Sequence, residues 1–223
     1  MATSGTYDFS MDIDEVIQEA SEMIGGEQTL GNQAASARRS INLLLQDWQN
    51  RGILLWTADT TAVSIAASVT TFAMSSATID ITEAVLNRDS TDLQLERITM
   101  EEYLKIPNKT QTGRPMQFAV RRNSSNIVVH LWPLSNVNTD KVKLEKISYM
   151  QDVNNSSQTP DISRRFLPCL TVGLSYYMSM KRPGVEAGRI SFLKQEYEER
   201  LARALHEDRE RASAYFLPRI RVY

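Results

Sequence analysis

Cysteine and histidine are scarce in this sequence, and their scarcity excludes several kinds of chemistry. The 223 residues include one cysteine, Cys169, and two histidines, His130 and His206. A single cysteine excludes a disulfide within the chain, and these three side chains are not spaced like the ligands of a zinc site. The glycine-rich loops that bind phosphate groups do not occur either. We therefore expect no metal and no cofactor.

Long apolar runs and a strong net charge are also lacking. No stretch approaches the roughly 20 apolar residues that a membrane-spanning helix needs, and residues 1–10 lack the basic and apolar regions of a secretory signal. The net charge is −2 and the pI is near 5.8, so the chain as a whole does not attract nucleic acid. We expect a protein that is made in the cytoplasm and has no membrane role.

The remaining candidates for catalysis are better explained as structural residues. Cys169 stands among apolar neighbours, as buried and unreactive thiols do, and His130 belongs to an apolar strand pattern. The carboxylates of residues 196–199 could in principle cleave a glycosidic bond, but arginines follow them at helical spacing, which is typical of a solvated helix face. The residues favour a structural protein over an enzyme.

The spacing of apolar residues divides the chain into helical ends and a β-rich middle. Residues 53–149 are rich in threonine, serine and valine, and apolar residues alternate with polar ones there, as in strands. Apolar residues three and four positions apart predict helices elsewhere. The expected helices span about residues 12–24, 32–50, 166–182 and 185–215.

Short-range signals mark several element ends. Asp12 and Glu15 have the spacing of a helix capping box, and so do Thr99 and Glu102 before a short helix in the β-rich middle. The alternation of the last predicted strand changes phase near Glu145, which predicts a β-bulge at that point.

Together these elements predict an α+β fold. The N-terminal and C-terminal segments form a helical bundle, and an antiparallel β-domain is inserted between them. We expect the bundle to comprise residues 1–52 and 161–216, and the β-domain residues 53–150. A polar linker over residues 151–160 leads back to the bundle, and an extended C-terminal arm covers residues 217–223.

Two features near the C-terminus favour assembly. The final helix combines an apolar stripe with acid-to-base pairs at the favourable spacing of four residues, which suits packing against helices of other subunits or of the same chain. The alternating arginines and apolar residues of the arm suit pairing with the sheet edge of a partner. The candidate inter-subunit residues are Glu196, Glu199, Arg200, Arg203, Glu207 and Arg211.

The order of several short motifs points to a family. They are Leu45-x-x-Trp48-x-x-Arg51-Gly52 with Leu55-Trp56, Ile98-x-x-Glu101-Glu102-Tyr103, Gly113-Arg114-Pro115, Leu131-Trp132-Pro133, Asp161-Ile162, Gly173-Leu174-Ser175-Tyr176 and Tyr197-Glu198. In this order and spacing, over nearly the whole chain, the sequence resembles the head-to-tail adaptor proteins of short-tailed bacteriophages. These are also called tail accessory or head completion proteins.

The resemblance implies a structural role at the head–tail junction of the virion. Such adaptors form a twelvefold ring beneath the portal of the DNA-filled head and receive the tail tube or nozzle, while DNA passes through the centre without sequence-specific contact. Their C-terminal segment reaches the portal, and no catalytic residue transfers with the motifs. The expected portal-binding residues are Phe216, Leu217, Arg219, Ile220, Arg221, Val222 and Tyr223.

On the residues alone, three other functions stay open. The protein could be another oligomeric component of a virion or tail, or a carboxylate-based peptidoglycan hydrolase. It could also be a DNA-binding module, because arginine pairs can contact phosphate groups. The pairs in question are Arg38-Arg39, Arg121-Arg122 and Arg164-Arg165.

Overall fold

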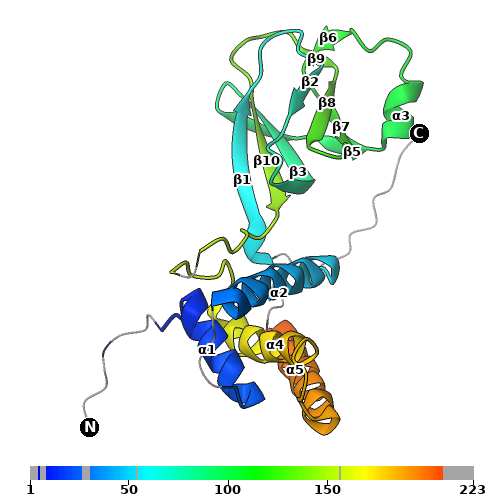
Figure 1. Cartoon of the computed structure of the whole chain (residues 1–223). Helices are drawn as coiled ribbons and strands as arrows, with labels where there is room; N and C mark the ends of the chain where they lie inside the picture. Colours follow the sequence, from blue (N-terminus) through cyan, green and yellow to red (C-terminus); the bar gives the residue numbers. More distant parts are fainter. Residues whose placement is uncertain (1–4, 6–8, 27–30, 54, 156, 208–223) are drawn as a thin grey trace. The chain divides into compact units, whose positions relative to one another are not determined.

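The computed structural model describes residue 5 and residues 9–26, 31–53, 55–155 and 157–207 (Figure 1). The chain forms two compact units. The helical unit consists of residues up to Leu45 together with those from Asp152 onward, and the β unit consists of residues 46–151. The expected α+β class is confirmed, because helices and antiparallel sheets are both present.

The helical unit is built around α4 (Leu167–Ser179), which contacts α1 (Ile13–Ile24) on one side and α5 (Ala187–Glu207) on the other (Figure 1). Residues all around α4 are buried, as expected for a helix that is covered from several directions. The short η2 helix (Arg164–Phe166) precedes α4, and Pro168 lies in its first turn, where proline is tolerated. α4 is therefore the core helix of this unit.

Local capping explains where α1 begins and ends. The Glu15 N–H donates to Asp12 Oδ1 at 2.8 Å, and the Asp12 N–H donates to Glu15 Oε2 at 3.0 Å, so the predicted capping box is confirmed. Gly25 ends the helix in the left-handed region, with φ of 80°. α2 (Gly31–Asn50) follows and runs across the boundary between the two units at residues 45 and 46.

The segment that the sequence marked as a polar linker is bound to the helical unit from Asp152 onward. The Val153 N–H donates to Asn42 Oδ1 at 2.8 Å, and Asn42 Nδ2 donates to the Val153 carbonyl at 3.2 Å. The Ile13 N–H donates to the Gln158 carbonyl at 3.0 Å. A single asparagine on α2 thus satisfies both backbone groups of Val153, which is itself buried.

The β unit contains two four-stranded sheets, which we call sheet A (β1-β10-β3-β4) and sheet B (β2-β8-β7-β5), and a two-stranded pair, β6-β9. The elements are η1 (Leu55–Thr57), β1 (Ala58–Ser64), β2 (Thr71–Ala73), β3 (Thr78–Arg88), β4 (Thr91–Gln94), β5 (Glu96–Ile98), α3 (Met100–Lys105), β6 (Thr112–Gly113), β7 (Gln117–Arg122), β8 (Ile127–Trp132), β9 (Leu134–Ser135) and β10 (Lys141–Ser148).

Both sheets contribute to one apolar core, which includes Leu86 and Leu144 from sheet A and Phe118 and Leu131 from sheet B. The predicted bulge is confirmed by a shift of register between Glu145 and Lys146. All pairs in sheet A are antiparallel. The pairs β5-β7 and β6-β9 are parallel, an addition to the antiparallel arrangement that we expected.

A buried ion pair joins the end of β3 to the loop before β10. Arg88 donates from Nε to Asp140 Oδ1 at 2.7 Å and from Nη2 to Asp140 Oδ2 at 2.6 Å. Ser135 Oγ donates to Asp140 Oδ2 at 2.6 Å. The Asp140 side chain is 0% exposed, and its hydrogen bond from Arg88 holds its pKa below the usual value.

Candidate assembly surface on the helical unit

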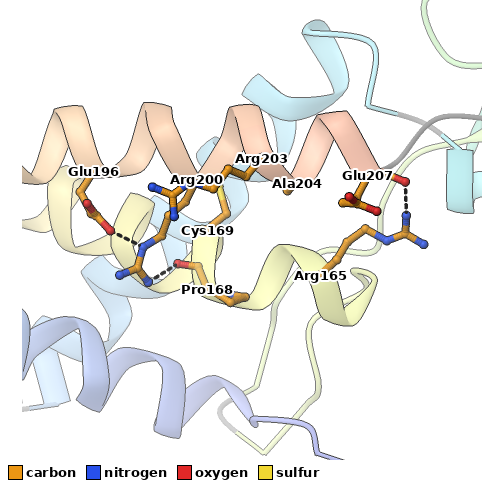
Figure 2. Close-up of a pocket in the computed structure, with 8 residues that line it drawn as sticks. All are labelled: Arg165, Pro168, Cys169, Glu196, Arg200, Arg203, Ala204 and Glu207. Carbon is orange, nitrogen blue, oxygen red and sulfur yellow. Dashed lines mark hydrogen bonds and ion pairs between the residues drawn. The ribbon is translucent and has the colours of Figure 1, made fainter.

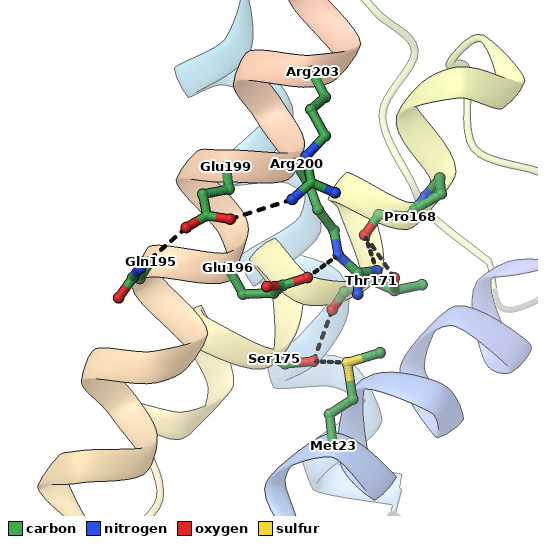
Figure 3. A network of polar contacts seen from close by, with 9 residues as sticks. All are labelled: Met23, Pro168, Thr171, Ser175, Gln195, Glu196, Glu199, Arg200 and Arg203. Carbon is green, nitrogen blue, oxygen red and sulfur yellow. Dashed lines mark hydrogen bonds and ion pairs between the residues drawn. The ribbon is translucent and has the colours of Figure 1, made fainter.

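The outer side of α5 carries the acid-to-base pairs that the sequence predicted (Figure 3). Arg200 Nε donates to Glu196 Oε1 at 2.7 Å, and Arg203 Nη2 donates to Glu199 Oε2 at 3.2 Å. Gln195 Nε2 also donates to Glu199, at 3.0 Å, so this carboxylate is held from both directions along the helix. These pairs are confirmed as contacts within one helix. Their role between subunits stays a prediction.

The two pairs differ in exposure. The side chains of Arg203 and Glu199 are 72% and 48% exposed, whereas those of Arg200 and Glu196 are 34% and 27% exposed. The first pair is therefore screened by water and contributes little to the stability of the fold. It lies open for contacts with another molecule.

A pocket of about 350 Å³ lies between α5 and the start of α4 (Figure 2). Its wall contains three arginines and two glutamates, so both signs of charge are present. The buried Cys169 and two other uncharged residues complete it. The lining residues are Arg165, Pro168, Cys169, Glu196, Arg200, Arg203, Ala204 and Glu207.

Arginines on both sides of this pocket tie α5 to the start of α4. Arg165 Nη1 donates to the Glu207 carbonyl at 3.0 Å, where it satisfies a carbonyl near the end of α5 (Figure 2). Arg200 Nη1 lies 3.5 Å from the Pro168 carbonyl. Both contacts join α5 to the residues at the start of α4.

Beneath this surface, short polar side chains and a glycine let the helices approach closely. Ser175 Oγ donates to the Thr171 carbonyl at 2.8 Å and lies 3.4 Å from Met23 Sδ, which links α4 to α1 (Figure 3). A Cβ at Gly173 would lie 2.9 Å from Tyr197 Cε2, so only glycine fits there without movement of the ring. The Gly173-Leu174-Ser175-Tyr176 motif therefore serves helix packing.

Several expected site residues lie outside the described residues. Arg211 is one of them, so the pairing of Glu207 with Arg211 stays a prediction. All of the expected portal-binding residues also lie outside the described residues. They are Phe216, Leu217, Arg219, Ile220, Arg221, Val222 and Tyr223.

The residues considered for catalysis lie in structural surroundings. Cys169 is buried in the helical unit. The ring of His130 in β8 packs against that of Tyr103 in α3, with 4.9 Å between centroids. Within the described ranges, no three histidine, cysteine, aspartate or glutamate side chains gather as they would around a metal ion. No helix in the same ranges is long and apolar enough to cross a membrane.

Comparison with known proteins identifies the family. The family model described as SU10 adaptor protein matches residues 11–222. The chain belongs to this family. No curated protein matches it. Membership of the SU10 adaptor family confirms the resemblance to phage head-to-tail adaptors, and it gives the chain a structural role as an adaptor in a bacteriophage virion.

The SU10 adaptor match is not confined to one unit. It includes α1 of the helical unit, the whole β unit, and the helices that follow it. It also extends beyond Glu207 into the segment where we expect portal contacts. The residues of α5 therefore lie within the part of the chain that the family model matches.

Proposed function

We propose that this chain is the head-to-tail adaptor of a short-tailed bacteriophage. Twelve copies form a ring that docks beneath the portal and receives the tail tube or nozzle. DNA passes through the ring without sequence-specific contact. The observation that carries the proposal is the family match over residues 11–222.

The outer face of α5 supports contacts between neighbouring copies. Residues 192, 196, 199 and 203 share one side of the helix, because they are spaced by four, three and four positions. Phe192 is 61% exposed on this side. An exposed aromatic ring that is bordered by charged pairs of both signs is typical of a protein interface. We assign Glu196, Glu199, Arg200, Arg203, Glu207 and Arg211 to this interface.

The composition of the C-terminal segment supports its role in docking. Arg219 and Arg221 alternate with Ile220 and Val222, so an extended conformation would place arginines on one side and apolar side chains on the other. Such a segment suits addition to a sheet edge of the portal. We propose that residues 216–223 reach the portal.

Light scattering would test the ring. The molar mass is measured for the chain alone and after mixing with the portal ring encoded by the same phage. We expect a complex with about one copy per portal subunit, because a template raises the effective concentration of weakly interacting copies. A mixture that elutes as separate portal and monomer contradicts the proposal. Rings that stack on one another and do not bind the portal would assign the chain to another part of the tail.

A truncated chain tests the docking segment separately. Deletion of residues 216–223 is expected to abolish portal binding while far-UV circular dichroism and the unfolding midpoint stay those of the full chain. The matched control is Lys105→Ala, which removes an exposed charge of the β unit and should leave portal binding unchanged. Undiminished portal binding by the truncated chain would exclude this role for residues 216–223.

A further inference from the structure

Sheet A ends in two open edges. β1 is the edge strand on one side and β4 is the edge strand on the other. Of the seven residues of β1 five are exposed, and of the four of β4 three are exposed. In the described part of the chain, no strand pairs with the outer side of either. The edge strands of sheet B are shorter, with three residues each.

Apart from the short length of β4, these two edges lack the features that usually prevent strand addition. Exposed edges are commonly protected by lysine, by proline or by a bulge. β1 reads ADTTAVS and β4 reads TDLQ, without lysine, arginine or proline. Their only charges, Asp59 and Asp92, face lysines of β10, at 3.7 Å from Lys146 and 2.7 Å from Lys143 respectively. Both edges are therefore close to neutral and can approach each other.

Hydrogen bonds at the ends of β1 and β4 show which backbone groups of these strands point away from sheet A. The Ile65 N–H donates to the Asp140 carbonyl at 2.9 Å, toward β10. Because successive residues of an antiparallel strand point to opposite edges, residues 60, 62 and 64 present their N–H and C=O groups outward. The Leu95 N–H donates to the Ala84 carbonyl at 2.9 Å, toward β3, so Asp92 and Gln94 point outward on β4.

The directions of the two edge strands are complementary. Each neighbouring pair in sheet A is antiparallel, and the sheet has four strands, so β1 and β4 run in opposite directions. β1 of one copy would therefore meet β4 of the next as an antiparallel neighbour.

We propose that β1 of each copy pairs with β4 of the next copy, so that sheet A continues across every subunit boundary. This inference rests on the proposed ring and names a second contact surface within it, separate from α5. A head-to-tail contact between two different edges is the type of interface that closes a ring. The occupant of each edge is thus a second copy of this chain.

Cross-linking of two different single variants tests the pairing. One chain carries Gln94→Cys, and the other carries Thr60→Cys, Ala62→Cys or Ser64→Cys to cover three registers. The two are mixed, assembled on the portal ring and mildly oxidised. The native Cys169 is buried and contributes little background. Because each chain carries one new cysteine, a disulfide between the two variants joins different copies.

The matched control is Glu83→Cys in place of Gln94→Cys, since Glu83 is exposed but lies in the interior strand β3. We expect one register to give roughly tenfold more cross-linked dimer than this control, because a disulfide needs Cα atoms within about 7 Å.

Ala62→Pro should weaken assembly without loss of secondary structure, because it removes an outward N–H and leaves the bonds to β10.

Each outcome decides the matter. Assembly on the portal with no cross-link above the control in any register overturns the edge pairing and leaves the ring intact. Absence of assembly overturns the ring and the edge pairing together. Cross-linking of Ala62→Cys to a chain with Ile220→Cys would make the C-terminal segment the occupant of β1, and would also overturn the pairing with β4.

Discussion

Two ion pairs, one in each unit of this protein, differ in their burial. The β unit encloses the Arg88–Asp140 pair, whose carboxylate is fully buried. The helical unit keeps its pairs on the surface of α5, where Glu199 and Arg203 are about half exposed or more. A buried pair fixes one arrangement of the loops around it, whereas an exposed pair stays available to a partner. Burial therefore makes the first pair the more important one for the stability of the fold.

The largest effect is expected from Arg88→Met. This change leaves Asp140 buried without its main partner, and an unpaired buried charge costs about 3–5 kcal/mol. The measurement is urea unfolding followed by tryptophan fluorescence, because all three tryptophans of the sequence, Trp48, Trp56 and Trp132, belong to the β unit.

The control for Arg88→Met is Lys143→Ala, which breaks an exposed pair in the same sheet. Its expected cost in stability is much smaller, because water screens the attraction between exposed charges. Equal losses of stability in the two variants would mean that burial does not distinguish the two pairs.

A smaller effect is expected from the pH dependence of the β unit. Burial lowers the pKa of His130 below 6.5, and the charge of Arg121 lowers it further. Its Nε2 has no hydrogen-bond partner among the described residues. Below pH 6.5 the unfolded chain therefore binds a proton more readily than the folded chain, and the free energy of unfolding decreases as the pH falls toward the pKa of the folded state.

Unfolding of the wild type and of His130→Phe at pH 7.5 and pH 5.5 measures this dependence. Phenylalanine keeps an aromatic ring against Tyr103 and removes the titration. We expect the wild type to lose more stability than the variant between the two pH values. An identical loss in both proteins would assign the pH dependence to other groups.

The smallest effect is expected from Glu199→Ala. The pair with Arg203 is exposed and spaced by four residues, so its loss should change the stability of the helical unit by at most about 0.5 kcal/mol. Glu196→Ala is the comparison, because it frees the half-buried Arg200 near Pro168 and should cost more. Thermal unfolding by far-UV circular dichroism measures both. A larger loss for Glu199→Ala would mean that the exposed pair supports the fold rather than a partner contact.

Much of the local structure could be predicted from the sequence, because its signals lie within a few residues. The capping boxes at Asp12 and Thr99 need only one partner three positions away, and both form as expected. The bulge near Glu145 was visible as a change in alternation. The pairs along α5 follow from helical spacing alone.

Contacts between distant residues could not be predicted in this way. Arg88 and Asp140 come from separate parts of the chain, and neither is marked by a local pattern as the partner of the other. The same holds for Arg165, whose partner is the Glu207 carbonyl, and for His130, whose neighbour is Tyr103. Residues 151–160 were predicted to be a polar linker, and the sequence alone did not reveal that Asn42 binds the backbone of Val153 within it.

The helical unit is made of two separate stretches of the sequence, and this affects the order in which the units can fold during synthesis. The β unit is one continuous stretch, so all of it is present once Gln151 has been made. α1 and the first part of α2 must wait for α4, whose residues begin only at Leu167. Since domains generally fold as units while the chain is made, the β unit can fold first and the helical unit last. The α5 surface therefore forms only after residue 207 has been made, later than the β unit.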